Sequence, residues 1–263
     1  MRLQTAFLAA LSSAFLASAA NAADLNLVNG NVLTVCSHLA NPPFEFVEDG
    51  SPAGFDMEVA DALAKSLGLE GKEVIDIPFE ALKSGAALNA RQCDVGINQV
   101  TPTPERRQNI GFSMDYLNDP EATGTLAGKG VKTFDDLAGK VLGVTSGSVE
   151  EVAFGKKLPE GATVKTYEDL LSLQKSVLTG QTDVIFYTYT GLAYKKDPNL
   201  EIGPDVLDIP NTYAVAVKKE GSEALLAAVD GALKTMIADG TIEKIAAKWF
   251  GSLPAEFAPQ VAK

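Results

Sequence analysis

The sequence predicts an α/β protein built on parallel sheets, and three features carry this prediction. Short apolar runs typical of buried strands alternate with longer segments whose apolar residues recur at helical spacing. The alternation starts again near Tyr116, so two βαβ sets with right-handed crossovers are expected. No internal repeat, low-complexity run or flexible linker separates the two sets.

The first 22 residues have the pattern of a cleavable export signal. Arg2 supplies a positive charge, an apolar stretch runs from Ala6 to Ala17, and Ala20-Asn21-Ala22 has the small-x-small pattern of a signal peptidase site. The apolar stretch is too short to span a bilayer, although an uncleaved membrane anchor is the alternative. We therefore expect residues 1–22 to be a signal peptide and the protein to be periplasmic.

The chain is acidic, with a net charge of −12, which becomes −13 without the signal segment because that segment contains only Arg2. The charges are dispersed, as expected for a solvated surface, and an acidic chain repels nucleic acid and anionic lipid. We therefore expect no nucleic-acid partner. The remaining length suffices for one large domain or two modest ones, each with its own core.

The first βαβ set is expected to run strand, helix, strand, helix, strand. Its first strand is Val32–Ser37, and the helix after Gly54 has Val59, Leu63 and Leu67 at helical spacing before Gly68 ends it. The later elements are a strand at 73–78, a helix at 80–90 and a strand at 94–100.

The second set begins with a strand at 122–127 and a helix start at 133–136 that has an acidic first turn. The elements expected after it are strands at 141–144, 163–167 and 184–187, with helices at 149–157 and 170–178 between them. A strand at 213–217 then leads to two helices at 223–239 and 241–250.

The segment from Thr101 to Arg107 is the first candidate for a binding loop. It leaves the strand at 94–100, and its two prolines force an extended turn over the carboxyl edge of the sheet, where ligands bind in open α/β folds. It presents Gln99, Thr101 and Thr103 before an arginine pair. A guanidinium beside hydroxyls suits a carboxylate, which it can grip with two parallel hydrogen bonds. A solvated loop with two surface arginines is the alternative.

Several motifs, in their order and spacing, resemble the solute-binding proteins of polar amino acid ABC importers. They are Pro42-Pro43-Phe44-Glu45-Phe46, Gly54-Phe55-Asp56-Met57-Glu58, Cys93-Asp94, Thr103-Pro104-Glu105-Arg106, Gly143-Val144-Thr145-Ser146-Gly147-Ser148, Gly180-Gln181-Thr182-Asp183 and Asp239-Gly240-Thr241. The resemblance covers nearly all of the chain after the signal segment. It implies the two-lobe periplasmic binding protein fold of type II, with a ligand cleft between lobes that are joined by a double-crossing hinge. Lobe 1 would comprise 23–116 and 212–263, and lobe 2 would comprise 117–211.

The resemblance also implies roles for particular residues. Arg106 matches the arginine that pairs with the α-carboxylate of the ligand, whereas Arg107 is expected to be a surface charge. Gln99 and Thr101 match positions beside that carboxylate. Ser148 lies at a helix start whose free amides attract an anion, although it could equally be an ordinary N-cap.

Two departures from the family pattern bear on the ligand. Family members often have an aspartate five residues after the position of Asp183, where it pairs with the ligand ammonium, but this chain has Thr188. A hydroxyl cannot neutralise an ammonium, although the ring of Tyr187 or Tyr189 could support a cation. An aromatic residue often precedes the Pro-Phe-Glu motif, where this chain has Asn41. The predicted ligand-binding residues are Arg106, Thr101, Gln99, Ser148, Thr188, Asn41, Phe44 and His38.

The two cysteines, Cys36 and Cys93, lie on or beside strands that are parallel neighbours in the resembled fold. In an oxidising compartment a disulfide is favoured over two buried thiols. One histidine, His38, and two cysteines are too few for a zinc site, so no metal is expected. A similar cysteine pattern occurs in periplasmic accessory proteins of quinoprotein alcohol dehydrogenases.

Three functions are therefore compared. The first is a monomeric periplasmic component that delivers an amino acid or related carboxylate to an inner-membrane ABC permease, without a cofactor. The second is an accessory protein of a quinoprotein dehydrogenase on the same fold, which the intact loop at Arg106 disfavours. The third is an enzyme, because cyclohexadienyl dehydratases share this fold. The candidate acids or bases, His38 and Glu45, have no evident second member, so no enzymatic activity is expected.

Overall fold

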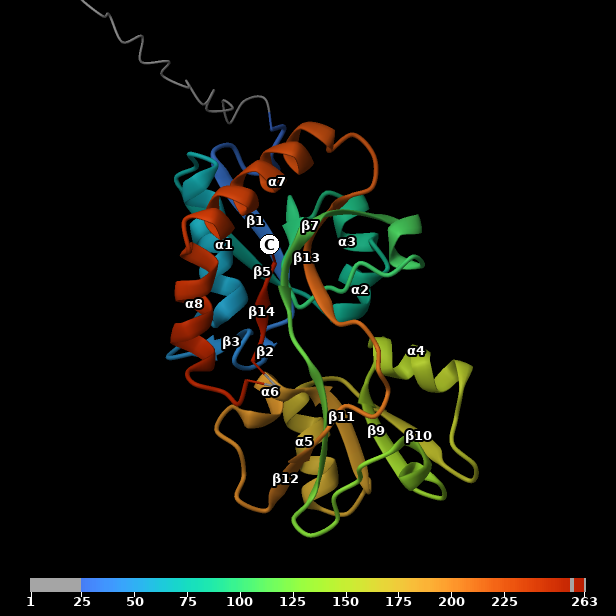
Figure 1. Cartoon of the computed structure of the whole chain (residues 1–263). Coiled ribbons are helices and arrows are strands. Elements are labelled where there is room, and N and C mark those ends of the chain that lie inside the picture. Colours follow the sequence, from blue (N-terminus) through green and yellow to red (C-terminus); the bar gives the residue numbers. More distant parts are fainter. Residues whose placement is uncertain (1–24, 256–257, 263) are drawn as a thin grey trace, which may run out of the picture.

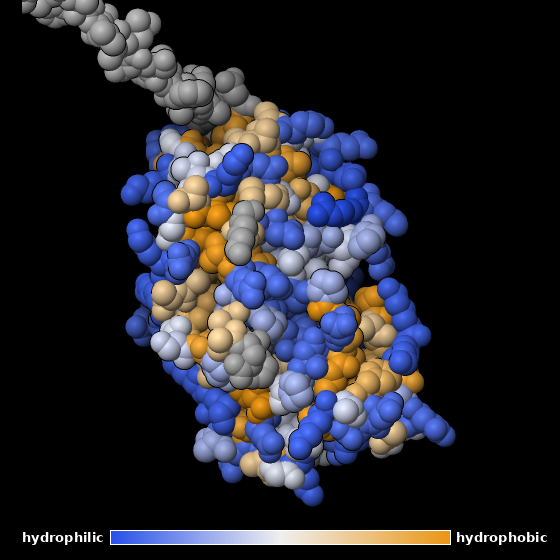
Figure 2. Space-filling view, viewed as in Figure 1, coloured by the Kyte–Doolittle hydropathy of each residue, from blue (hydrophilic) through white to orange (hydrophobic). Residues whose placement is uncertain are grey.

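The computed structural model describes residues 25–255 and 258–262, and these form two α/β lobes, one above the other in Figure 1. The predicted signal peptide lies outside the described residues. Within the described part of the chain, no helix is both long and apolar enough to cross a membrane. Hydrophilic side chains cover most of the face in Figure 2, with hydrophobic areas between them on both lobes.

The first lobe is built on a six-stranded sheet with the order β14-β7-β13-β6-β1-β5. In that order, the strands are Gln260–Val261, Ile110–Asn118, Thr212–Lys218, Val95–Gly96, Val32–Ser37 and Gly71–Asp76. Strand β1 pairs in parallel with β5 and β6, whereas β13 is antiparallel to β6 and β7. The first βαβαβ set is thus the parallel half of a mixed sheet.

Helices cover both faces of this sheet (Figure 1). The helices α1 (Phe55–Ser66), α7 (Glu223–Ala238) and α8 (Thr241–Phe250) bury apolar residues against the face that carries Leu33 and Val35. The short helices α2 (Phe79–Lys83) and α3 (Ala86–Asn89) cover the opposite face, where Cys36 lies. Two separate apolar cores therefore hold one sheet and fix the directions of its strand ends.

The second lobe has a five-stranded sheet with the order β10-β9-β11-β8-β12. In that order, the strands are Thr163–Tyr167, Val141–Thr145, Val184–Thr188, Glu121–Leu126 and Leu200–Gly203. The helical segments of this lobe are η3 (Phe134–Leu137), α4 (Val149–Lys156), α5 (Leu170–Leu178) and α6 (Tyr189–Ala193). Parallel pairing of β9 with β10 and β11 makes the predicted second βαβ set.

The chain passes between the two sheets twice. Strand β7 continues through Asp119 and Pro120 into β8, and the segment 204–211 returns the chain from β12 to β13. The two passages lie side by side, because Asn118 of β7 pairs with Thr212 of β13. This is the double crossing that the family resemblance implied.

A small three-stranded sheet lies where the lobes meet and consists of β2 (Ala40–Asn41), β3 (Glu45–Glu48) and β4 (Ser51–Ala53). Gly54 follows it with φ +122, and a Cβ atom there would lie 2.1 Å from the carbonyl oxygen of Phe44. Only glycine permits this approach of two backbones. Gly54 thereby allows the backbone at the start of α1 to pack directly against the backbone at Phe44, just before β3.

The structure corrects several of the expected elements. The strand expected at 94–100 is only Val95–Gly96, because residues after it leave the ladder and Gln99 has φ +48. The helix expected at 80–90 is two short helices, since Gly85 between them is left-handed at φ +79. The helix start predicted at 133–136 is confirmed, with Thr133 as N-cap and Asp135 and Asp136 in the first turn, and the helix is a short 3₁₀-helix. The long strand β7 was not expected.

The predicted disulfide is confirmed. Cys36 and Cys93 are bonded, with their Cα atoms 5.7 Å apart, and both residues are buried. The pairing of Val35 with Val95 shows that β1 and β6 are the adjacent parallel strands that were expected. The bond joins two strands whose carboxyl ends carry residues that face the second lobe.

Removal of the disulfide should lower the free energy of unfolding. The two cysteines are 57 positions apart. Opening a loop of this size increases the conformational entropy of the unfolded chain and thereby lowers its free energy by about 4 kcal/mol. We expect the Cys36→Ala/Cys93→Ala variant to lose about 2–4 kcal/mol in guanidinium denaturation. Wild type reduced with dithiothreitol serves as the control and should lose a similar amount. Equal stabilities of oxidised wild type and variant would contradict this prediction.

Candidate functional site

A cavity of about 70 Å³ lies between the two lobes and is lined by residues from both. Seven of the eight predicted ligand-binding residues line it: His38, Asn41, Gln99, Thr101, Arg106, Ser148 and Thr188. Tyr187, whose ring was considered as a support for a cation, also lines it, whereas sequence reasoning missed further lining residues, of which those used below are Phe79, Asn98, Glu150, Glu168, Asn211 and Tyr213. Because the carboxyl ends of parallel strands point toward the cavity from each sheet, a small ligand in it would contact both lobes.

The guanidinium of Arg106 is held at the junction of the lobes. Its Nη1 donates to the carbonyl of Thr101 at 2.9 Å, and its Nη2 donates to the carbonyl of Gly147 in the second lobe at 2.9 Å. It also lies 5.5 Å from the ring centroid of Phe79. Burial lowers the pKa of Arg106 to about 10, so the group stays charged at neutral pH. Two of its five donors are used by carbonyls, and the others can meet an anion.

The start of α4 faces the same cavity. Ser148 caps the helix, accepting from the amide of Glu151 at 3.2 Å, so the predicted capping role is confirmed. Ser148, Val149 and Glu150 line the cavity. The unpaired amides of a first helical turn favour an anion, and Gly147, at φ +74, forms the left-handed turn that aims its carbonyl at Arg106. The positive guanidinium and the helix start therefore meet at one place.

Gln99 connects the lobes at the floor of the cavity. Its amide nitrogen donates to Tyr213 at 3.2 Å, and its amide oxygen accepts from Tyr187 of the second lobe at 2.9 Å. Its left-handed backbone is held by a hydrogen bond from Gln99 N to the buried carboxyl of Asp56 at 2.8 Å. Its side chain is thus a polar contact between the lobes in this structure.

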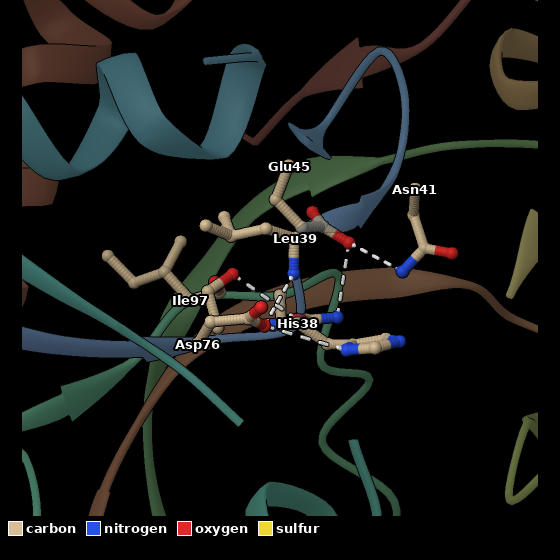
Figure 3. A network of polar contacts seen from close by, with 8 residues as sticks. His38, Leu39, Asn41, Glu45, Asp76 and Ile97 are labelled. Carbon is tan, nitrogen blue, oxygen red and sulfur yellow. Dashed lines mark hydrogen bonds and ion pairs between the residues drawn. The ribbon is translucent and has the colours of Figure 1, made fainter. Parts of the chain in front are cut away.

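Asn41 and His38 belong to a polar network beneath the cavity (Figure 3). Asn41 donates to the buried carboxyl of Glu45 at 3.1 Å and accepts from the amide of Leu170 in the second lobe at 3.2 Å. Asn98 also donates to Glu45, at 3.1 Å, and its oxygen accepts from the amide of His38. Burial raises the pKa of Glu45 well above its usual value.

Phe44 is the predicted site residue that does not line the cavity. It is fully buried in the core of the first lobe, where its ring lies 5.8 Å from Phe55 and 5.1 Å from Phe250. The turn after Asn41 reverses the direction of the side chains, so Asn41 faces the second lobe while Phe44 packs under α1 and α8. Its role is to hold the loop.

Thr188 lies at the cavity, but its hydroxyl is used within the second lobe. It caps α6, accepting from Gly191 N at 3.4 Å, and is 3.1 Å from the hydroxyl of Thr190. Thr190 in turn donates to Asp119. Of the two tyrosines proposed to support a cation, Tyr187 lines the cavity, whereas Tyr189 packs against the core of the second lobe.

Several carboxyl groups surround the site. Glu150 lines the cavity and is 4% exposed, while Glu168 lines it from an exposed position. Asp119 and Glu121 are buried behind them, in the first chain crossing and at the start of β8. Burial raises the pKa of Asp119 to about 7, and burial together with the Glu150 carboxyl raises that of Glu121 well above its usual value. Among the described residues, no group of His, Cys, Asp and Glu could hold a metal ion.

A family model fits this architecture. The model for bacterial extracellular solute-binding proteins, family 3, matches residues 33–252. The chain belongs to this family. The match includes the whole second sheet, the first sheet apart from Val32 and β14, and all the lining residues of the cleft.

Individual relatives agree with the family assignment. The chain is 33% identical over 217 residues to the L-cystine-binding protein TcyJ of Escherichia coli K12, covering 80% of this chain and 79% of that protein. A solved ancestral arginine-binding protein with bound arginine superposes with a TM-score of 0.77 at 32% identity, covering 84% of this chain and 99% of that one. An ancestral amino acid-binding protein, a precursor of cyclohexadienyl dehydratase, has a TM-score of 0.75 at 28% identity, over 84% and 96% of the two chains. The fold is therefore the predicted two-lobe type II binding-protein fold.

The buried carboxyl groups should make the protein less stable as the pH rises. A folded pKa of about 7 for Asp119, against 3.8 for its ordinary value, means that the folded state retains a proton that the unfolded chain releases. The resulting stabilisation, about 4 kcal/mol, is complete below pH ~4 and is lost as the pH rises through 7. We expect Asp119→Asn to flatten the fall in melting temperature between pH 4.5 and 7.5, measured by calorimetry.

The exposed Glu70→Gln variant is the control for this measurement and should keep the wild-type slope. Asp56 and Glu121 have raised pKa values for the same reason, so part of the slope should persist in Asp119→Asn. A slope unchanged by Asp119→Asn would mean that Asp119 is ionised at low pH in the folded protein.

Proposed function

We propose that this protein is the substrate-binding component of an ABC importer and that it binds an amino acid in the cleft between its lobes. The observation that carries the proposal is the position of Arg106, whose guanidinium contacts Thr101 in one lobe and Gly147 in the other. The start of α4 adds a second attraction for an anion at the same point. A carboxylate bound there would join the lobes and favour the closed cleft.

The names of the relatives support an amino acid as the solute. TcyJ is named for L-cystine, and the ancestral protein holds arginine in its structure. In a two-lobe protein, the cleft between the lobes is the usual site for a small ligand. The polar groups left in the cavity here, including Asn98, Thr101 and Asn211, suit a polar solute.

The further parts of the proposal concern cellular location, assembly and the boundaries of the lobes. We infer that residues 1–22 direct export to the periplasm, where the protein acts as a monomer with an inner-membrane permease. We assign 23–116 and 212–263 to lobe 1 and 117–211 to lobe 2, which is consistent with the crossing at Asp119 and with the pairing of Asn118 and Thr212. Closure would then bend the two adjacent passages of the chain.

The two competing functions have less support. An accessory role in a quinoprotein dehydrogenase system was suggested by the cysteines, but these form a disulfide within a core of the first lobe and say nothing of a partner. An enzyme would need a positioned acid and base. Glu45 Oε1 accepts from Asn41 and Asn98, and His38 Nδ1 lies 3.7 Å from Asp76, which favours a structural role for both.

The test is the affinity of Arg106 variants. A thermal-shift screen of wild type against the twenty standard amino acids and L-cystine identifies the solute, because a ligand that binds only the folded state raises the melting temperature. Calorimetry should then show that Arg106→Ala weakens binding by about 2–5 kcal/mol, the scale for unpairing a buried charge. Arg106→Lys should recover only part of this, since an ammonium cannot make the planar fork.

Arg107→Ala is the matched control. Arg107 is the neighbouring arginine, but it is exposed and donates to the carbonyl of Pro102 outside the cavity. It should leave affinity unchanged. Wild-type affinity in Arg106→Ala, or equal losses in both variants, would refute the assignment of the carboxylate site.

A further inference from the structure

The cleft contains a positive and a negative group that do not pair with each other. Arg106 and Glu150 line the same cavity, and the Glu150 carboxylate is the charge that most favours the protonated guanidinium. No ion pair among the described residues includes either of them, so their charged atoms are more than 4 Å apart. A dipolar molecule between them would satisfy both charges.

Glu150 is the carboxylate at the cavity that lacks a partner. It is 96% buried, its carboxyl lies beside that of Glu121, and no ion pair among the described residues includes it. Burying an unpaired charge costs several kcal/mol, so a site of this kind favours a cation. Glu168, the other lining carboxylate, is exposed to water and needs no such partner.

The residue expected to face a ligand ammonium cannot do so as an ion pair. Thr188 is uncharged, and its hydroxyl is engaged by Gly191 and Thr190. Asp119, which lies behind this hydroxyl chain, is fully buried and does not line the cavity. Glu150 reaches the cavity from the other side, at the start of α4.

We propose that Glu150 binds the ammonium group of the ligand while Arg106 binds its carboxylate, so that an amino acid lies between the two side chains. This inference rests on the proposed function, because it takes the carboxylate to be at Arg106. It makes Glu150 the residue that distinguishes an amino acid from an acid without the amine.

The carboxyl of Glu121 lies beside that of Glu150 and adds to the acidic character of this part of the cleft. Its Oε1 accepts from Asn211, whereas its buried Oε2 has no hydrogen-bond partner. The carboxyls that raise the pKa of Glu121 are those of Glu150 on α4, Asp119 in the chain crossing and Asp205 after β12, and the hydroxyls of Tyr187 and Tyr213 also lie within its field. The raised pKa of Glu121 therefore favours its protonated form beside the Glu150 carboxyl.

An arriving ammonium changes this balance. A positive charge beside these carboxyls favours the ionised form of Glu121, so binding should release a proton wherever Glu121 is protonated in the free protein. Affinity for an amino acid should consequently rise with pH through that range. An acid without the amine should give no such release.

The experiment compares three pairs of probes by calorimetry: L-arginine with 5-guanidinopentanoate, L-glutamine with 4-carbamoylbutanoate, and L-cystine with 3,3′-dithiodipropionate. The members of each pair differ only in their α-amines, of which L-arginine and L-glutamine have one and L-cystine has two. In wild type, the amino acid that binds should do so about 30-fold or more tightly than its deamino partner, since unpairing a buried charge costs at least about 2 kcal/mol. In Glu150→Gln the two affinities should converge.

The direction of each change distinguishes this role from a structural one. Glu150→Gln should weaken the amino acid but strengthen the deamino acid, because the uncompensated carboxylate is gone. Glu160→Gln is the matched control, since it removes an exposed carboxylate of the same lobe that does not line the cavity, and it should alter neither affinity more than about twofold. A variant that merely misfolds would weaken both probes together.

Glu121→Gln tests the supporting group. It should retain the preference for the amine and lose the proton release, counted from binding enthalpies in two buffers of different ionisation enthalpy. Equal preferences in wild type and Glu150→Gln would overturn the inference alone, leaving the Arg106 assignment in place. Loss of the preference in Asp119→Asn but not in Glu150→Gln would also overturn it. If wild type bound none of the amino acids in the screen, the proposed function would fall together with it.

Discussion

The guanidinium of Arg106 is the contact on which the arrangement of the two lobes most depends. It is a buried cation that binds a backbone carbonyl of each lobe, and it lies among acidic groups on both sides. A cation with unsatisfied donors in a closing cleft must either meet an anion or be exposed to water again. The same group therefore couples ligand chemistry to the position of the lobes.

The elements around Arg106 serve to place it. The loop from Thr101 turns over the carboxyl edge of the first sheet, and Thr103 accepts from the amide of Arg106 at 3.2 Å. The disulfide fixes β1 against β6, whose continuation carries Gln99 and this loop. On the second lobe, Gly147 and Ser148 shape the start of α4. Backbone groups and small side chains thus surround the proposed anion site, and the arginine is the one long flexible side chain that the proposal requires.

The buried acidic residues favour a positive charge at the same junction, as Arg106 favours a negative one. Glu45, Asp56, Asp119 and Glu121 are buried at or near the junction of the lobes, and burial raises the pKa of each. Such groups cost stability when ionised, which the protein tolerates at the place where a ligand adds its own charge. The difference between Thr188 here and the family aspartate fits this picture, since an acidic group is present elsewhere in the cleft.

The sequence by itself determined the α/β class, the order of most elements and the cysteine pair, and it pointed to Arg106, around which the carboxylate site is proposed. Periodicity specifies strands and helices locally, and the Thr-Pro-Glu-Arg loop carries its own turn signals. Only the tertiary structure decided that Phe44 is a core residue, that Thr188 is engaged within its own lobe and that Glu150 faces Arg106. The reason is that Glu150 lies 44 positions after Arg106 on a helix whose outward and inward faces look alike in sequence. Which face meets the cleft depends on how two separately folded sheets come together, and no local pattern records it.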